Sequence, residues 1–171
     1  MDELGAIMLG NESALEKYMK EKPRRRDESI ISKAMAVQIG VMGAWLTILS
    51  FIFLKAPFFN QFFNSEELKL TAYFVLFIVI AFFNGFNVRD DDFGIFKGLD
   101  ENTGFLKVFF AIIAIQAVIV NAALVPLAPF QWLSTMFSCV PFGLQRWCTV
   151  LVLSVNMIGI DGVRKLFTVK Q

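Results

Sequence analysis

The chain has 171 residues, 56% of them hydrophobic, and Phe alone accounts for 20. Its mean hydropathy is +0.60, whereas soluble domains contain about 45–50% apolar residues, so this composition indicates a membrane protein. The formal net charge is +1 and the sequence contains no His. This balance argues against binding to nucleic acid and excludes acid–base catalysis by His.

Residues 1–33 are predicted to form a partial helix followed by a basic cytoplasmic loop. Residues 1–9 are mostly apolar and lead directly into a stretch centred on the sequence Lys-Pro-Arg-Arg-Arg at 22–26. Ser13 and Glu16 have the spacing of a capping box, and Pro23 stops a helix, so a short cytoplasmic connector helix is expected between them. Such a beginning is typical of the last part of a helix within a larger membrane protein.

Four apolar runs follow, at residues about 34–54, 70–86, 105–125 and 140–160. The first run has no charged residue, and at about 1.5 Å per residue it spans about 30 Å, the thickness of the hydrocarbon core. We therefore expect an all-α membrane protein with four transmembrane helices in a bundle. The bundle occupies residues 34–161, and residues 162–171 form a cytoplasmic tail.

Charge placement predicts the orientation of these spans. Lys and Arg are abundant before the first span and occur again in the loop at residues 87–107 and in the tail, whereas the loop at 126–146 holds only Arg146. Because positive residues accumulate on the cytoplasmic side, both termini are predicted to be cytoplasmic. Trp132 and Trp147 then fall at the outer interface, where aromatic residues gather. The chain is thus expected to be a multi-pass protein of a membrane whose identity is left open.

Several amides lie within the apolar runs. Asn84 and Asn87 are three positions apart, on one face of the cytoplasmic end of the second span. Amides in such positions bond across helices or to loop backbone, and direct ion ligation is the less favoured alternative. Gln116, Asn121 and Asn156 are interpreted in the same way. These residues are therefore predicted to be structural polar groups.

Acidic residues offer few candidate ion sites. Asp2 is interpreted as a surface residue if it stands at a terminus, and as part of an ion pathway if it belongs to an intact membrane helix. Residues 90–101 have acidic residues at positions one and twelve of a calcium loop, but Gly94 and Ile95 replace the residues that an EF-hand needs. Asp161 is expected in the headgroup layer, beside Arg164 and Lys165.

Cys139 and Cys148 lie nine positions apart between two apolar runs. The spacing differs from Cys-x-x-Cys, and without His a zinc site is not expected. Two alternatives remain open. The two residues are either separate cysteines at the membrane interface or partners in a disulfide on a non-cytoplasmic face.

The order of several short motifs resembles calcium-transporting P-type ATPases, from the end of the sixth transmembrane helix to the tenth. The motifs are Asp2 with Ala6 and Leu9, Lys-Pro-Arg at 22–24 with Ile-Ile-Ser at 30–32, Phe-Asn-Gly-Phe-Asn at 83–87, Ile-Phe-Lys-Gly at 95–98, Ala-Ile-Gln at 114–116, Phe-Ser-Cys at 137–139 and Trp-Cys at 147–148. The cysteine-containing motifs resemble those of the plasma-membrane type. The likeness extends over nearly the whole chain, to about Asp161.

The resemblance implies a support role beside the ion-binding helices of a pump. It makes Asp2 a calcium ligand only if the helix that precedes it is intact. It departs from the sarcoplasmic type at Ala81, where that type has an acidic ligand, so the second calcium site of that type is not expected. The motif of the phosphorylated Asp (Asp-Lys-Thr-Gly-Thr) does not occur in this sequence.

Function as an enzyme is therefore left uncertain. The chain is expected to be a fragment or a split-pump part with no catalysis and no cofactor of its own, acting as an enzyme only within a calcium-transporting P-type ATPase. In the full pump, magnesium and ATP would be used and calcium transported. The expected partners are the lipid bilayer and the remaining portion of the ATPase, its helices one to five and its cytoplasmic domains. The alternative is a free-standing four-helix membrane protein that acts as an accessory or binding subunit.

Overall fold

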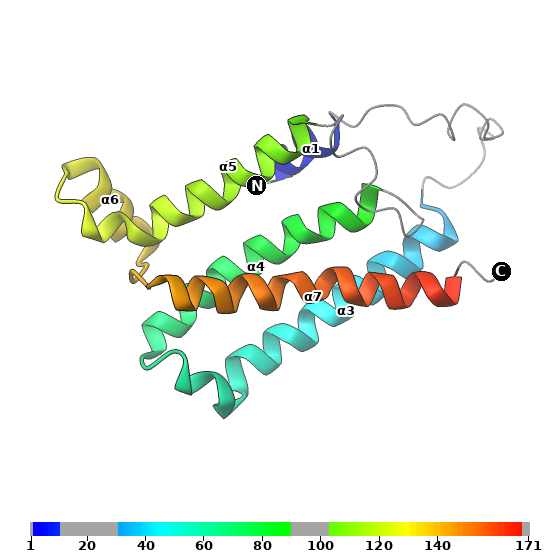
Figure 1. Cartoon of the computed structure of the whole chain (residues 1–171), viewed down its shortest axis with the longest axis horizontal. Coiled ribbons are helices and arrows are strands. Elements are labelled where there is room, and N and C mark those ends of the chain that lie inside the picture. Colours follow the sequence, from blue (N-terminus) through cyan, green and yellow to red (C-terminus); the bar gives the residue numbers. More distant parts are fainter. Residues whose placement is uncertain (1, 11–30, 90–102, 169–171) are drawn as a thin grey trace.

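A computed structural model of the chain describes residues 2–10, 31–89 and 103–168 (Figure 1). In these ranges the chain forms α-helices and short 3-10 helices, and no strand occurs in them. The helices are α1 (Asp2–Gly10), α3 (Lys33–Lys55), η1 (Pro57–Gln61), α4 (Glu66–Arg89), α5 (Thr103–Asn121), η2 (Ala122–Leu124), α6 (Ala128–Phe137) and α7 (Leu144–Thr168). The all-α fold expected from the sequence is confirmed.

Helix α4 lies at the centre of the bundle. It contacts α1, α3, α5 and α7, and the long helices α3, α4, α5 and α7 alternate in direction along one axis of the molecule (Figure 1). One end of the bundle therefore carries η1, α6 and the first turn of α7. The opposite end carries the first turn of α3, the last turn of α4 and the end of α7.

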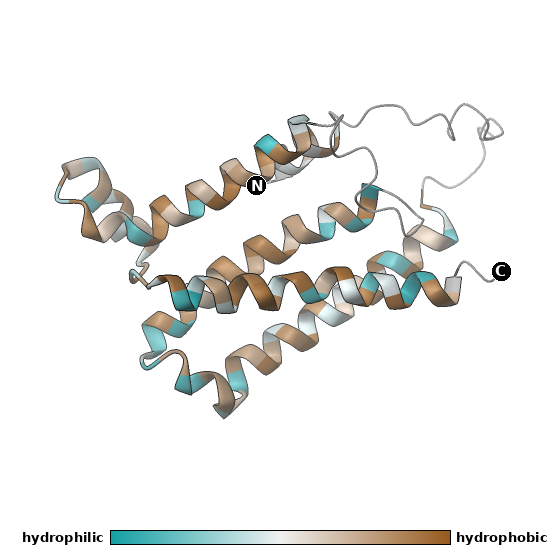
Figure 2. Ribbon diagram, in the orientation of Figure 1, coloured by the Kyte–Doolittle hydropathy of each residue, from teal (hydrophilic) through white to brown (hydrophobic). Residues whose placement is uncertain are grey.

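Three helical segments are long and apolar enough to cross a membrane: Lys33–Lys55, Glu66–Arg89 and Thr103–Leu124. Figure 2 shows hydrophobic residues along most of their length. Helix α7 has 25 residues but is not among these three segments, because polar and charged residues interrupt its apolar sequence near both ends. The chain is an integral membrane protein with three candidate spans, where the sequence analysis expected four.

Local side-chain bonds explain where two spans begin. The hydroxyl of Ser32 accepts a hydrogen bond from the backbone nitrogen of Met35 at 3.2 Å, so it caps α3. The hydroxyl of Ser65 accepts a hydrogen bond from the nitrogen of Leu68 at 3.2 Å at the start of α4. Each bond satisfies one of the backbone N–H groups that have no partner within the first helical turn.

The last two long helices differ in extent from the apolar runs that predicted them. Helix α5 ends at Asn121 and passes into η2, whereas the apolar run suggested a helix as far as residue 125. Helix α7 begins at Leu144 rather than at residue 140, because Pro141 and Gly143 disfavour a helix before it. It continues to Thr168, so most of the segment predicted as a cytoplasmic tail is helical.

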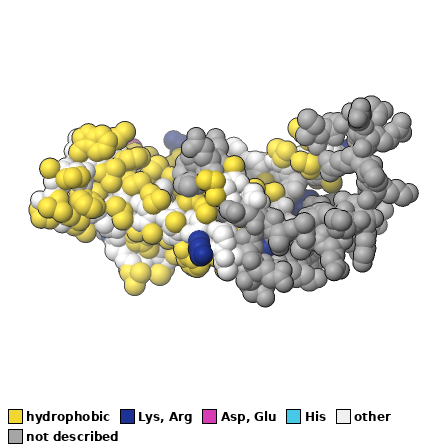
Figure 3. Space-filling model, turned by 90° about the horizontal axis from the view of Figure 1, so that it is seen from above, with side chains coloured by type: hydrophobic (Ala, Val, Ile, Leu, Met, Phe, Trp, Pro, Cys, Tyr) yellow, Lys and Arg dark blue, Asp and Glu magenta, His cyan; other side chains and the backbone are white. Residues whose placement is uncertain are grey.

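Helix α6 was not predicted by the sequence analysis. Gln131 explains part of its position, because its side-chain nitrogen donates a hydrogen bond to the carbonyl oxygen of Val125 at 2.8 Å. Large apolar side chains of α6 are exposed, including Trp132 at 65% and Met136 at 63%. Figure 3 shows hydrophobic side chains gathered over the end of the molecule where α6 lies. An apolar surface of this kind fits contact with lipid.

Two apolar clusters hold the helices together. In the first, the fully buried Phe53 of α3 packs against Phe59 and Phe63, with ring centroids 4.8 and 5.5 Å apart. In the second, Phe86 of α4 packs against Phe105 and Phe109 of α5, with centroids 4.8 and 5.1 Å apart. The pairs of the second cluster are edge-on, and such pairs are worth about 0.5–1.5 kcal/mol each beyond the area that they bury. The first cluster packs the end of α3 against η1 and the loop before α4, and the second packs α4 against α5.

Candidate functional site

Asn87 links α4 to α7. Its side chain is 1% exposed, and its amide nitrogen donates hydrogen bonds to Asn84 Oδ1 at 3.2 Å and to the backbone carbonyl oxygen of Met157 at 3.1 Å. A carbonyl oxygen has two lone pairs, so the oxygen of Met157 can accept this bond besides its helical one. The spacing of Asn84 and Asn87 thus allows a bond within α4, and Asn87 in addition bonds α4 to α7.

Asn156 lies one position before Met157 and faces a different neighbour. Its Oδ1 accepts a hydrogen bond from the indole nitrogen of Trp45 on α3 at 2.8 Å. Adjacent residues of α7 therefore bond to α3 and to α4. A pair of such bonds fixes both the rotation of α7 about its axis and its height relative to the other two helices. The sequence analysis expected Asn156 to bond to another helix but did not identify Trp45.

A buried group of charges lies one turn farther along α7. Asp161 Oδ1 is 2.6 Å from Arg164 Nε, and Asp161 Oδ2 is 2.9 Å from Lys165 Nζ. The side chains of the three residues are 1%, 6% and 2% exposed, respectively. The expected neighbours of Asp161 are present, but they are buried within the fold rather than spread over its surface. Pairing is what makes this burial tolerable, because an isolated buried charge is very costly.

Two further polar residues are buried beside α5. Gln116 is 3% exposed, and its Oε1 has no hydrogen-bond partner within the described part of the chain. Arg89, at the last turn of α4, is 6% exposed and its guanidinium lies 4.9 Å from the ring centroid of Phe105. The Phe105 ring thus covers the positive charge that ends α4.

A residue that sequence reasoning overlooked joins the start of α4 to the loop before α7. The hydroxyl of Thr71 accepts a hydrogen bond from the nitrogen of Val140 at 3.1 Å, and nothing in the local sequence distinguishes it. Arg146 has a similar role, because its Nε donates to the carbonyl oxygen of Phe62 at 3.0 Å. Both bonds fasten the loops at the end of the bundle that carries η1.

Both cysteines are free thiols, so the disulfide alternative is not realised in this structure. Cys148 is exposed, whereas Cys139 is buried in the loop that precedes α7. Burial raises the pKa of the Cys139 thiol, and a hydrogen bond with the Thr71 side chain partly offsets the increase. The two thiols therefore differ in access to solvent.

The candidate ion ligand Asp2 is the first residue of α1, a helix that contacts α5 and α4. The position of its side chain lies outside the description, and so do the connector helix expected after Ser13 and the acidic residues at 90–101. Among the described residues, no group of three or more Cys, Asp or Glu could hold a metal ion. Asn87 and Asn156 bond α7 to its neighbours, whereas the charges of Asp161, Arg164 and Lys165 pair within α7.

The family described as "Cation transporting ATPase, C-terminus" matches residues 1–167. The chain belongs to this family. It is 30% identical over 171 residues to the probable calcium-transporting ATPase 8, plasma membrane-type, of Oryza sativa subsp. japonica. That alignment covers 94% of the chain and 15% of the relative. It is 25% identical over 169 residues to the plasma membrane calcium-transporting ATPase mca-1 of Caenorhabditis elegans. That alignment covers 92% of the chain and 13% of the relative.

A third member of this family, calcium-transporting ATPase 9, plasma membrane-type, of Arabidopsis thaliana, is 29% identical over 178 residues, with 100% of the chain and 16% of the relative covered. The chain thus spans only 13–16% of the length of these relatives. The resemblance inferred from the short motifs, including the plasma-membrane type, is confirmed. Asn84, Asn87 and Asp161 can now be considered as parts of a cation-ATPase membrane region.

Proposed function

We propose that the chain is the membrane-support part of a calcium-transporting ATPase of the plasma-membrane type. The observation that carries the proposal is the family match over residues 1–167. The packing supports it, because α4 is held by α3, α5 and α7 through aromatic clusters and hydrogen bonds. A bundle fixed in this way suits a static support against which neighbouring ion-binding helices can move.

In this proposal α7 is the fourth transmembrane helix, and both termini are cytoplasmic. The direction of the helices supports this arrangement, because α7 follows α3, α4 and α5 in regular alternation (Figure 1). Its charged residues Asp161, Arg164 and Lys165 lie near one end and are paired. Paired charges near the end of a span cost far less than single charges at the centre of the bilayer.

Phosphoryl transfer takes place in other parts of the proposed pump. ATP hydrolysis of this kind needs an aspartyl nucleophile, magnesium and contacts to the nucleotide, and the described residues show no such set. Asp2 would act as a calcium ligand only as part of an intact helix that continues before it. We therefore expect that the purified chain alone has no calcium-dependent ATPase activity.

A chimaera tests the support role. The corresponding C-terminal region of a plasma-membrane-type calcium pump would be replaced by residues 1–167 of this chain. Calcium uptake and formation of the phosphorylated intermediate would then be measured in membrane vesicles. We expect uptake that depends on ATP, because the four helices supply the packing surface that the pump needs. The same pump without this region serves as the inactive control.

The same experiment separates the proposal from its rival. A chimaera that enters the membrane in normal amount but forms no phosphorylated intermediate would contradict the support role. A free-standing accessory subunit would give that result, and it would also leave the chain stable when expressed alone. Measurable calcium-dependent ATPase activity of the purified chain would contradict the assignment of chemistry to other parts of the pump.

A further inference from the structure

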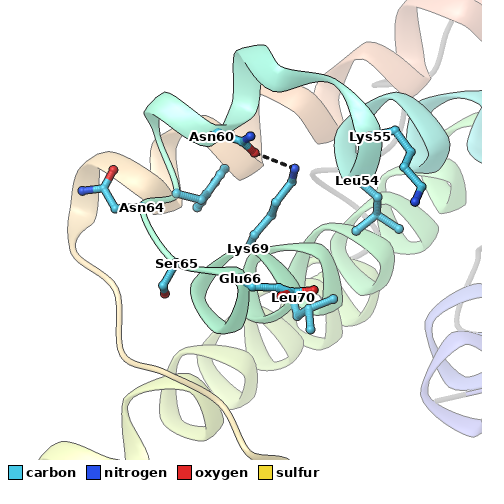
Figure 4. A pocket seen from close by; sticks show the side chains of 9 residues that line it. Leu54, Lys55, Asn60, Asn64, Ser65, Glu66, Lys69 and Leu70 are labelled. Carbon is cyan, nitrogen blue, oxygen red and sulfur yellow. Dashed lines mark hydrogen bonds between the residues drawn. The ribbon is translucent and has the colours of Figure 1, made fainter.

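A cavity of about 570 Å³ lies at the end of the bundle that carries η1. It is open on one side and is lined by the last turn of α3, by η1 with the loop that follows it, and by the first turn of α4 (Figure 4). The lining side chains with charge are Lys55, Glu66 and Lys69, and Asn60, Asn64 and Ser65 add hydrogen-bonding groups. Two lysine side chains and one carboxylate thus line one space.

One of these charges is held in place. Lys69 extends across the cavity, and its Nζ donates a hydrogen bond to Asn60 Oδ1 at 2.8 Å (Figure 4). Lys55 and Glu66 are exposed, and within the described part of the chain neither has an ion-pair partner. An ammonium group has three donors, so Lys69 keeps two of them available for a ligand.

The position of the cavity limits the ligand class. Lys55 and Glu66 are the terminal residues of two helices that are long and apolar enough to cross a membrane. Lipid headgroups lie at the ends of such spans. Apolar side chains border the charged groups, because Leu54 and Leu70 also line the cavity and Leu70 is 53% exposed. The site therefore suits a ligand that has a charged part next to an apolar part.

We propose that this cavity binds the headgroup of a zwitterionic phospholipid in the leaflet at this end of the bundle. The phosphate accepts hydrogen bonds from the ammonium groups of Lys55 and Lys69, and the ammonium of the headgroup pairs with Glu66. The acyl chains lie along the apolar surface that includes Leu70. The inference requires that α3 and α4 cross a membrane, and it does not depend on any pump activity.

Lipid titration tests the proposal. The full chain, purified in detergent and freed of bound lipid, would be titrated with phosphatidylethanolamine, and the bound lipid counted by native mass spectrometry. A charge-assisted hydrogen bond is strong enough to change affinity by about tenfold. We therefore expect that Lys69→Gln weakens binding by about tenfold. Adding Lys55→Gln to this variant should weaken binding further. The matched control is Lys33→Gln, an exposed lysine at the opposite end of α3, which is expected to leave the affinity unchanged.

A second variant tests the zwitterionic assignment. Glu66→Gln keeps the size of the side chain but removes its charge, so the preference for phosphatidylethanolamine over phosphatidylglycerol should disappear. Far-UV circular dichroism of each variant checks that it folds, and the change in preference is measured on Glu66→Gln alone if a lysine variant does not fold. Equal affinity of the wild-type chain for both lipids would overturn the zwitterionic assignment.

Soluble ligands distinguish a lipid site from a simple anion site. Glycerophosphoethanolamine and inorganic phosphate carry the same phosphate chemistry without acyl chains. We expect neither to displace the bound lipid at concentrations similar to it. Displacement by either one, or lipid binding that is unchanged in the Lys55→Gln/Lys69→Gln variant, would overturn the proposal.

Discussion

The buried charges of α7 give the largest single-residue effect that we expect. Asp161 accepts from Arg164 at 2.6 Å and faces Lys165 at 2.9 Å, and the side chains of all three are less than one-tenth exposed. The substitution Asp161→Asn keeps the shape of the side chain and removes its negative charge. Two buried positive groups then lose the carboxylate that faces them.

The magnitude follows from the cost of breaking a buried ion pair. Removing one partner of such a pair destabilises a protein by about 3–5 kcal/mol where the other charge loses its compensation. Arg164 and Lys165 make further interactions besides those with Asp161, so we expect a loss at the lower end of this range. Both cations lie in the last two turns of α7, where the helix dipole favours positive charge by about 0.3–1 kcal/mol. Subtracting this term, we expect Asp161→Asn to lower the free energy of unfolding by about 3 kcal/mol.

Unfolding by sodium dodecyl sulfate in mixed micelles measures this difference, with the fluorescence of the three tryptophans as the signal. The control is Glu67→Gln, which neutralises an exposed carboxylate in the first turn of α4 that does not line the cavity described above. It should change the free energy of unfolding by less than about 0.5 kcal/mol, as for most surface substitutions. A loss below about 1 kcal/mol for Asp161→Asn would show that water reaches the ion pair, and would refute the reasoning.

Three smaller effects follow from the other contacts. Asn87→Leu should lower the free energy of unfolding by about 1 kcal/mol in the same assay, because hydrogen bonds between membrane helices average about 0.6 kcal/mol and reach about 1.7; no change would mean that the amide finds other partners in the variant. Trp45→Phe removes the bond to Asn156 and should cost about 1 kcal/mol, whereas Trp45→Phe in an Asn156→Leu background should cost clearly less, since the bond is already lost. In single-cysteine variants, exposed Cys148 should react with iodoacetamide faster than buried Cys139 at pH 8. Because burial raises the pKa of Cys139, its rate should begin to rise at a higher pH than the rate of a free cysteine thiol in solution. Equal rates of the two variants, measured by mass spectrometry, would contradict the difference in burial.

The helical fold and the family could be predicted because they depend on patterns that extend along the chain. Long uncharged runs indicate spans, and the order of the short motifs indicates the ATPase family. The ends of helices were less accurate, since hydropathy measures only how apolar a segment is. Pro141 and Gly143 lie inside an apolar run, and they delay the start of α7 to Leu144. Hydropathy also failed to predict α6. Its ten residues are too few to cross a membrane, so the segment was interpreted as part of the loop between two spans.

The polar contacts show a sharper limit. The spacing of Asn84 and Asn87 was sufficient to predict that they share a face of α4. It could not identify Met157 as a partner, because the acceptor is a backbone carbonyl and every residue has one. Trp45 and Asn156 are 111 positions apart, and pairing over that separation depends on how three helices pack. Long-range partners of this kind follow from the assembled bundle, whereas the side chains that need partners can be recognised beforehand.

The hydrogen bond between Asn87 and Met157 has a consequence for biosynthesis. Its two residues are 70 positions apart along the chain, so at about 5–20 residues per second a ribosome needs about 4–14 s to synthesise the intervening segment. During that interval the amide of Asn87 has to be satisfied by Asn84, by water or by the insertion machinery. Early release of α4 into lipid would leave it without its principal neighbour. Cells that produce this chain would therefore benefit from a translocation site that retains α4 until α7 has emerged.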